Sequence, residues 1–253
     1  MLEREIPKIA NWLREKVTEA HAEGLVIGLS GGVDSAVAAA ISKLAYPNNT
    51  LVINIPINSN PRDNEDAKLV ARAIELAYHE LDLTKEHQIL REKLFTKINL
   101  AAHQQIDQRL VDANLRARLR MSVLYAAANA LNYLVIGTDN KSEYYTGYFT
   151  KFGDGACDIL PLVDFTKSEI IELASLLNIP DQIINKPPSA GLWAGQTDEA
   201  EMGTTYGYID AYLQGEQIPE KDSKIIMRLH ANSAHKRTVP YKYLRSTMQK
   251  DRR

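Results

Sequence analysis

The chain has 253 residues, of which 45% are hydrophobic and 25% charged, and its formal net charge is −2, as expected for a globular protein with a real core and no global signal for nucleic-acid binding. No apolar run approaches the roughly 20 residues that a membrane-spanning helix needs, and residues 1–16 are too charged for a signal peptide. The single cysteine, Cys157, excludes an internal disulfide and fits a reducing compartment, so we expect a cytoplasmic protein.

Short apolar runs alternate with segments of helical period through much of the chain. The first helix places Ile6, Ile9 and Leu13 on one face, and the run that follows Gly24 has the character of a buried strand. Strands are predicted over residues 25–29, 51–55, 80–83 and 133–137, and helices over residues 6–24, 34–44, 63–78 (capped by Asp63), 106–132, 167–178, 203–213 and 219–230.

This alternation predicts an α/β protein with an open parallel sheet and helices on both of its faces, a Rossmann-like arrangement. The last helices are expected to be additions at the C-terminus. Residues 185–197 contain four Gly or Pro residues and no periodicity, so they are interpreted as a mobile loop. We expect one domain over residues 1–253.

The segment of residues 235–253 forms a basic C-terminal end, with seven Lys or Arg residues against one acid, Asp251. Such an end is most often solvated surface or disordered. A phosphate-binding role for its first residues is an equal alternative, whereas RNA binding is the weaker interpretation.

The string Ser30-Gly31-Gly32-Val33-Asp34-Ser35 lies between the first predicted strand and the next helix. Ligands bind at this position in open α/β sheets, where glycines allow close approach of the backbone and the helix N-terminus attracts phosphate. An acid in an anion site requires a bridging cation, so Asp34 indicates Mg²⁺. The plainer alternative is a strand-to-helix turn in which Asp34 or Ser35 caps the helix.

The full string resembles the pyrophosphate-binding loop of the ATP pyrophosphatase superfamily, and it lacks the lysine of the Walker loop. Four further stretches resemble the ammonia-dependent NAD synthetases of that superfamily, from about residue 4 to residue 241. They are Asn114-Leu115-Arg116-Ala117-Arg118-Leu119-Arg120-Met121, Gly137-Thr138-Asp139-Asn140-Lys141-Ser142-Glu143, Thr146-Gly147-Tyr148-Phe149-Thr150-Lys151-Phe152-Gly153-Asp154-Gly155, and His235-Lys236-Arg237 with Pro240.

The resemblance implies a set of site residues. Taken alone, several of them would not be assigned to a site, because a lysine such as Lys151 is more often an exposed surface residue. Mg²⁺ would be held by Asp34 and Glu143, and these two with Lys167 and Asp154 would be the catalytic residues. Asp154 is the candidate for orienting ammonium. ATP would contact Gly28, Leu29, Ser30, Gly31, Gly32, Val33, Asp34, Ser35, Thr138, Lys167 and Ser189, and deamido-NAD would contact Arg118, Lys151, Asp158, His235 and Lys236.

Ser189 departs from the family pattern, which often has Thr, but its hydroxyl is kept. Asp158 precedes an apolar Ile-Leu pair and has a plain alternative as the start of a strand. Cys157 has no Cys or His partner in its segment, so we interpret it as a small packing residue without covalent chemistry.

The implied reaction is the ATP- and Mg²⁺-dependent amidation of deamido-NAD by ammonia, which yields NAD, AMP and pyrophosphate through a nicotinyl adenylate. The resemblance also implies a homodimer. Because it already fills the chain, no room is expected for an amidase domain, and free ammonia rather than glutamine is the expected nitrogen source. The competing interpretations are an RNA-modifying adenylase and a nucleotide-binding module without catalysis.

Overall fold

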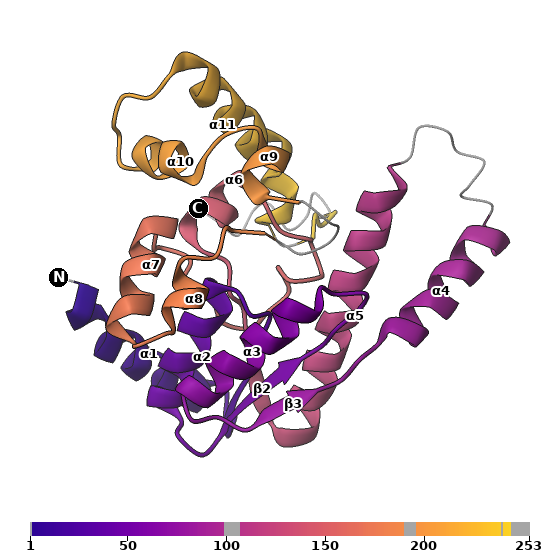
Figure 1. Ribbon diagram of the computed structural model, residues 1–253, viewed down its shortest axis with the longest axis vertical. Coiled ribbons are helices and arrows are strands. Elements are labelled where there is room, and N and C mark those ends of the chain that lie inside the picture. Colours follow the sequence, from indigo (N-terminus) through magenta and orange to yellow (C-terminus); the bar gives the residue numbers. More distant parts are fainter. Residues whose placement is uncertain (1, 99–106, 190–195, 239, 244–253) are drawn as a thin grey trace.

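The fold is built on a sheet of four parallel strands in the order β3-β2-β1-β4 (Figure 1). A computed structural model describes residues 2–98, 107–189, 196–238 and 240–243. The register places Ile27 of the central strand opposite Val52 on one side and Ile136 on the other. The strands are β1 (Gly24–Gly28), β2 (Thr50–Asn54), β3 (Tyr78–Glu80) and β4 (Tyr133–Ile136).

Helices cover both faces of this sheet, because successive side chains of a strand point to opposite sides. Leu25 and Ile27 belong to the large core that packs on one face, whereas Val26 packs with Ala128 on the other. The first face carries α1 (Glu5–Glu19), α2 (Val33–Ala45), α3 (Pro61–Ala73) and α7 (Lys167–Leu176), and the second carries α5 (Gln108–Leu131). The predicted fold class, an open parallel α/β sheet, is confirmed.

A second, smaller core joins the C-terminal helices to the main body. Met202, Tyr206, Ile209 and Ile226 are buried together and pack against Tyr145. Figure 1 shows these helices as a separate layer above the sheet. The elements involved are α6 (Lys141–Thr146), α9 (Asp198–Met202), α10 (Tyr206–Leu213) and α11 (Glu220–Asn232), and the remaining ones are α4 (Thr84–Lys97), α8 (Asp181–Ile184) and the 3-10 turns Leu2–Arg4 and Ala234–Lys236.

Several predicted boundaries were wrong. Helix α3 begins at Pro61, and its cap is Asn60, whose side chain accepts from the Arg62 backbone N–H at 3.1 Å, rather than Asp63. Strand β3 begins two residues before its predicted start and ends at Glu80. Helix α4 was not predicted, because its apolar residues form no stripe, and only His87 is buried along it.

Within the described residues, no helix is both long enough and apolar enough to cross a membrane. Most of the basic segment 235–253 falls outside the described residues, as does the middle of the predicted loop 185–197. The described parts of that loop on either side are irregular, as predicted.

Candidate active site

The loop that resembles a pyrophosphate-binding loop, residues 30–35, is called the phosphate-type loop below. It follows β1 and leads directly into α2. Gly31 has a φ of +80°, and a Cβ atom there would lie 2.4 Å from the Asp63 carbonyl oxygen, so only glycine fits. Two hydroxyls organise the turn: Ser35 Oγ donates to the Gly32 carbonyl at 2.9 Å and lies 3.0 Å from Ser30 Oγ. The helix cap is Gly32, which contributes no side chain. The alternative in which Asp34 or Ser35 is merely the cap of this helix is therefore wrong.

Three elements bring Asp34, Glu143 and Lys167 together at the carboxyl edge of the sheet. Lys167 Nζ lies 2.5 Å from Asp34 Oδ2 and 3.3 Å from Glu143 Oε1. The lysine side chain is only 5% exposed. Asp34 comes from the start of α2, Glu143 from α6 and Lys167 from α7. The structure thus brings together three of the four residues predicted to be catalytic, and their roles stay predictions.

The position of the Glu143 side chain is fixed by hydrogen bonds at the N-terminus of α6. Asn140 caps α6 by accepting from the Glu143 backbone N–H at 3.0 Å, and the Glu143 side chain accepts from the Asn140 N–H at 3.3 Å. The Asn140 amide also donates to Asp34 Oδ1 at 2.8 Å. One asparagine thus connects the two carboxylates, and Tyr206 adds a hydroxyl that donates to Glu143 Oε1 at 3.0 Å.

The cluster holds two acids and one base, and this imbalance affects its protonation. The pKa of Glu143 is raised to about 7, chiefly by burial and also by the Asp34 carboxylate, although Lys167 opposes the rise. Burial lowers the pKa of Lys167, but the Asp34 and Glu143 carboxylates outweigh it, so the pKa ends above its ordinary value. The site therefore has an unneutralised carboxylate in a buried place, which favours an additional cation.

The donor set fits Mg²⁺. This ion prefers oxygen ligands and is usually bound through one or two carboxylates together with substrate phosphates. Asp34 and Glu143 supply two such carboxylates beside the phosphate-type loop. No group of three His, Cys, Asp or Glu residues suited to a metal occurs among the described residues, so the protein offers no closed metal cage there.

Three of the predicted dinucleotide-binding residues are linked by hydrogen bonds, and a fourth, Lys236, bonds to the same part of the chain. Arg118 donates to the Lys151 carbonyl at 3.2 Å, and the Lys151 ammonium donates to the His235 carbonyl. Lys236 donates to the carbonyls of Gly147 and Phe149, at 2.8 and 2.6 Å. Residues far apart in the sequence are thus gathered around the segment that follows α6.

Other predicted residues stand apart from these groups. The Asp158 carboxylate accepts from the Val135 backbone N–H at 2.8 Å and from Tyr125 at 3.1 Å, so it fastens the segment beside β4. The predicted alternative, that Asp158 begins a strand, is wrong, because only an isolated bridge follows it at Ile159. Asp154 accepts from the Thr150 N–H at 3.1 Å. Thr138 is half-buried after β4, and Ser189 is exposed after α8.

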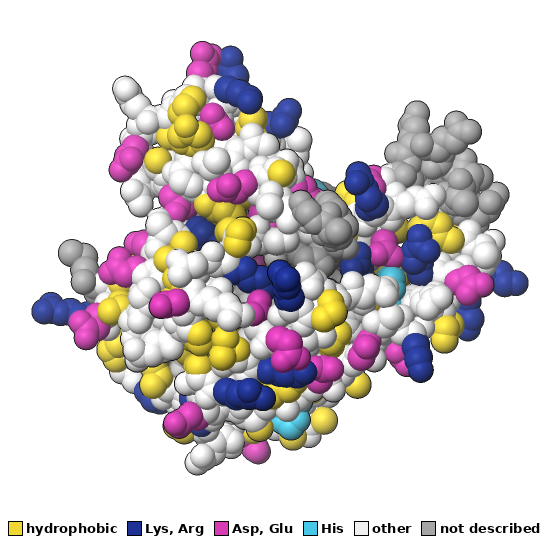
Figure 2. Space-filling view, viewed as in Figure 1, with side chains coloured by type: hydrophobic (Ala, Val, Ile, Leu, Met, Phe, Trp, Pro, Cys, Tyr) yellow, Lys and Arg dark blue, Asp and Glu magenta, His cyan; other side chains and the backbone are white. Residues whose placement is uncertain are grey.

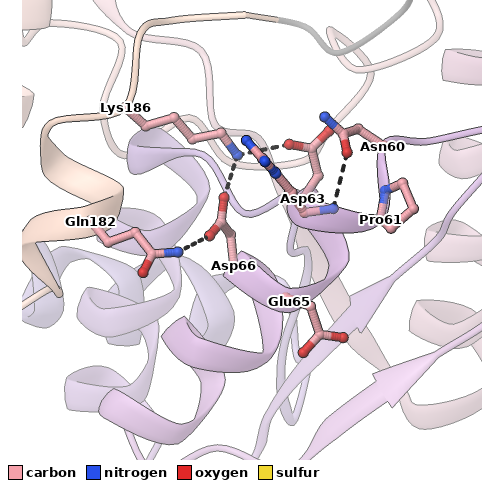
Figure 3. A pocket seen from close by; sticks show the side chains of 8 residues that line it. Asn60, Pro61, Asp63, Glu65, Asp66, Gln182 and Lys186 are labelled. Atoms are coloured by element: carbon pink, nitrogen blue, oxygen red, sulfur yellow. Dashed lines mark hydrogen bonds and ion pairs between the residues drawn. The ribbon is translucent and has the colours of Figure 1, made fainter.

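A cleft of about 640 Å³ opens next to the loop, between α3 and α8 (Figure 3). Lys186 crosses it and binds Asp63 at 2.8 Å and Asp66 at 2.6 Å, and Gln182 donates to Asp66 at 2.6 Å. Figure 2 shows basic and acidic side chains intermixed over this face, without a large patch of either sign, in keeping with the net charge of −2.

The NAD synthase family model matches residues 5–240 of this chain. The NH(3)-dependent NAD(+) synthetase of Alkaliphilus oremlandii is 52% identical over 240 residues, which are 94% of this chain and 96% of that protein. The chain belongs to the NAD synthase family.

Solved structures of NAD synthase relatives agree with the fold. NMN synthetase from Francisella tularensis superposes with a TM-score of 0.88 and 41% identity, covering 96% of this chain and 98% of that one. The NH3-dependent NAD synthetase from Campylobacter jejuni gives a TM-score of 0.76 and 28% identity over 96% and 99% of the two chains. Membership of a ligase family favours the enzyme over a module that only binds nucleotides, and over an RNA-modifying adenylase.

Three residues of this NAD synthase site were missed by the sequence analysis. Asn140 had a usable signal, because Asn followed by Glu three residues later is a capping-box pattern. Tyr206 and Asp198 had none: they come from the C-terminal helices, and the Tyr206 hydroxyl reaches Asp198 at 3.1 Å as well as Glu143. Only the packing of the second core places them here.

Proposed function

We propose that this chain amidates deamido-NAD with ammonia, converting ATP to AMP and pyrophosphate and yielding NAD. The observation that carries the proposal is the Asp34–Lys167–Glu143 cluster, buried beside a glycine loop after β1, in a chain 52% identical to an NH(3)-dependent NAD(+) synthetase. We include in the proposal a single synthetase domain over residues 1–253, a cytoplasmic location and a homodimer.

The reaction has two steps. A carboxylate oxygen of the nicotinate group attacks the α-phosphorus of ATP, and the bond to pyrophosphate breaks, which leaves a nicotinyl adenylate. Ammonia then attacks the acyl carbon, AMP departs with the bonding electrons, and the surplus proton is lost. Activation is needed because AMP is a far better leaving group than oxide.

The residues of the chain contribute mainly charge and position. Lys167 holds a positive charge near the phosphates, and the loop from Gly28 to Ser35 faces them with its backbone and hydroxyls. Mg²⁺ held by Asp34 and Glu143 would supply further neutralisation of the phosphate oxygens. Arg118, Lys151, His235 and Lys236 hold the dinucleotide together with Asp158, whose carboxylate also fastens the segment beside β4. Asp154 orients ammonium, and Thr138 and Ser189 contact ATP.

A second candidate differs in the size of the acceptor. The Francisella tularensis relative is described as an NMN synthetase, and its TM-score of 0.88 exceeds the 0.76 of the Campylobacter jejuni NAD synthetase. The same amidation chemistry on nicotinate mononucleotide would give NMN. Both acceptors share the nicotinate and its ribose phosphate, so the catalytic cluster serves either.

One experiment tests both candidates. The protein is incubated with ATP, Mg²⁺, ammonium and either deamido-NAD or nicotinate mononucleotide, and the products are identified by mass spectrometry. NAD and AMP in equal amounts from the dinucleotide, at a higher kcat/KM than for the mononucleotide, are expected. Preference for the mononucleotide would favour the second candidate, and no product from either acid would overturn the proposal. Asp34→Ala and Glu143→Ala, which should stop pyrophosphate release without unfolding the chain, serve as inactive controls.

A further inference from the structure

A buried carboxylate of the C-terminal helices lies between the first turns of α6 and α7. Asp210, on α10, is 5% exposed and accepts four hydrogen bonds. Ser142 Oγ of α6 donates to Oδ1 at 2.5 Å. From α7, Ser168 Oγ donates to Oδ2 at 2.6 Å, and the backbone N–H groups of Ser168 and Lys167 donate at 3.0 and 3.4 Å.

The two serines are the sequence neighbours of two cluster residues. Ser142 directly precedes Glu143, and Ser168 directly follows Lys167. The same two helix starts are thus joined twice, through the Lys167–Glu143 ion pair at 3.3 Å and through the shared carboxylate of Asp210. A shift of either helix start would stretch both connections.

Neither helix needs Asp210 in order to begin. Helix α6 has a complete capping box from Asn140 and Glu143, and α7 has one from Thr166 and Glu169. The bonds of Asp210 are therefore additional to the caps, and their effect is to connect the two helices. Charge-assisted bonds of this kind are short and about twice as strong as neutral ones, and a carboxylate is also favoured at a helix N-terminus.

We propose that Asp210 is a positioning residue that sets the relative placement of Glu143 and Lys167, and so the Mg²⁺ and ATP requirements of the reaction. The inference rests on the proposed function for the roles of those two residues. It gives the C-terminal helices a part in the chemistry through hydrogen bonds to the two helix starts. Groups that orient the ligands of a metal in this way change affinity or activity by about 10- to 100-fold when altered.

The test separates the two arms of the connection. Ser142→Ala removes only the bond on the Glu143 side, Ser168→Ala removes a bond on the Lys167 side, and Asp210→Asn keeps the shape but loses the charge. Asp222→Asn is the matched control, because Asp222 accepts a 2.8 Å bond from the buried Thr204 hydroxyl between C-terminal elements outside the Glu143–Lys167 cluster. For each variant we would measure the melting temperature, the half-saturating Mg²⁺ at saturating ATP, and the KM for ATP at saturating Mg²⁺.

We expect Ser142→Ala to raise mainly the Mg²⁺ requirement, Ser168→Ala mainly the KM for ATP, and Asp210→Asn both, by about tenfold or more. The control should change the melting temperature alone. Asp210→Asn with parental Mg²⁺ and ATP requirements would overturn the inference, as would equal shifts in Asp222→Asn. Failure of the parent protein to form an amide from either acid would instead remove the proposed function, so the two failures are distinct.

Discussion

Within the described part of the chain, one lysine, Lys167, bonds to both Asp34 and Glu143, and this excess of two acids over one base decides the electrostatics of the site. A single buried base cannot neutralise two acids, so one negative charge is left over. The pKa of Glu143, raised to about 7 by burial and by Asp34, expresses that imbalance. A bound divalent cation with its phosphates would relieve it, which is why the site suits Mg²⁺ and a nucleotide together.

The raised pKa of Glu143 predicts how the ligand-free protein responds to pH. Its pKa is higher in the folded chain, about 7, than the ordinary value of 4.5, so between these values the folded state holds more protons. Stability should therefore fall as pH rises through this window and then level off. Glu143→Gln lacks the titrating group, so its melting temperature should fall less between pH 5 and pH 7.5 when both proteins are scanned by calorimetry.

The difference between the pH profiles of the parent and of Glu143→Gln reports Glu143 alone, because the other groups that titrate in this range are present in both proteins. At pH 8, Mg²⁺ with ATP should raise the melting temperature of the parent more than that of Glu143→Gln, since the variant lacks a ligand. Parallel pH profiles for the two proteins would show that Glu143 ionises normally, and the electrostatic account would then be wrong.

Cys157→Ser should keep most of the activity. Burial, with the nearby Asp139 and Asp158 carboxylates, raises the pKa of the Cys157 thiol to about 12, so almost no reactive thiolate exists at neutral pH. The sulfur packs tightly on Gly137, where an added Cβ would lie 2.5 Å from it. Steady-state assays should show less than about a tenfold loss, or ~1.4 kcal/mol of barrier. A larger loss in a variant that melts like the parent would point to chemistry at this thiol.

Helices and strands could be predicted from the sequence where the spacing of apolar residues and the neighbouring turn residues indicate the same element. Strands β1, β2 and β4 could be predicted because each is a short apolar run, and each lies within a residue of its predicted bounds. Strand β3 is Tyr-His-Glu and has no such run, so its position was predicted less well. The loop after β1 could be placed because a strand, two glycines and a helix follow one another. Parallel strands then put Asp34 and the segment of Glu143 at the same edge of the sheet.

The elements that were missed have no such signal. Helix α4 exposes Ile89 and Leu90 and buries only His87, so its pattern has no apolar face. Helices α6, α8 and α9 span four to six residues, too few to show a period. The contacts of Tyr206 and Asp210 with the cluster depend on how the C-terminal core docks, which local sequence does not record.

Lys186 connects α3 to the segment after α8, and its removal should loosen that connection. Lys186→Met would leave Asp63 and the 6% exposed Asp66 side chain without their cation. Leaving buried polar groups unpaired costs about 1–3 kcal/mol, so chemical denaturation should show a loss of that order. Lys68→Met is a matched control, since Lys68 also pairs with two acids, Glu65 and Glu80, but these are more exposed, so its loss should be clearly smaller. Equal losses would mean that the Lys186 bridge contributes no more than a surface pair.

At the scale of the whole molecule, the site draws on nearly the full length of the chain. The phosphate-type loop comes from β1 and α2, the carboxylate from α6, the lysine from α7 and the tyrosine from α10. Helix α4 and the first turns of α5 project from this body as an arm of two helices (Figure 1). The arm holds Ile89, Leu90 and Leu110 in exposed positions, with exposed fractions of 54%, 42% and 49%.

We predict that the protein is a homodimer and that this arm takes part in the contact. Apolar side chains gathered on a projecting element are typical of interaction surfaces, and in a two-fold dimer the same surface is buried twice. Light scattering should therefore give twice the chain mass of 28.4 kDa. Leu110→Glu should weaken the dimer, whereas Leu44→Glu, at an equally exposed leucine (47%) near the end of α2, should leave it intact. A fully active particle of 28.4 kDa at assay concentration would contradict the dimer. A dimer that is unaffected by Leu110→Glu would instead show that the dimer interface lies away from this end of α5.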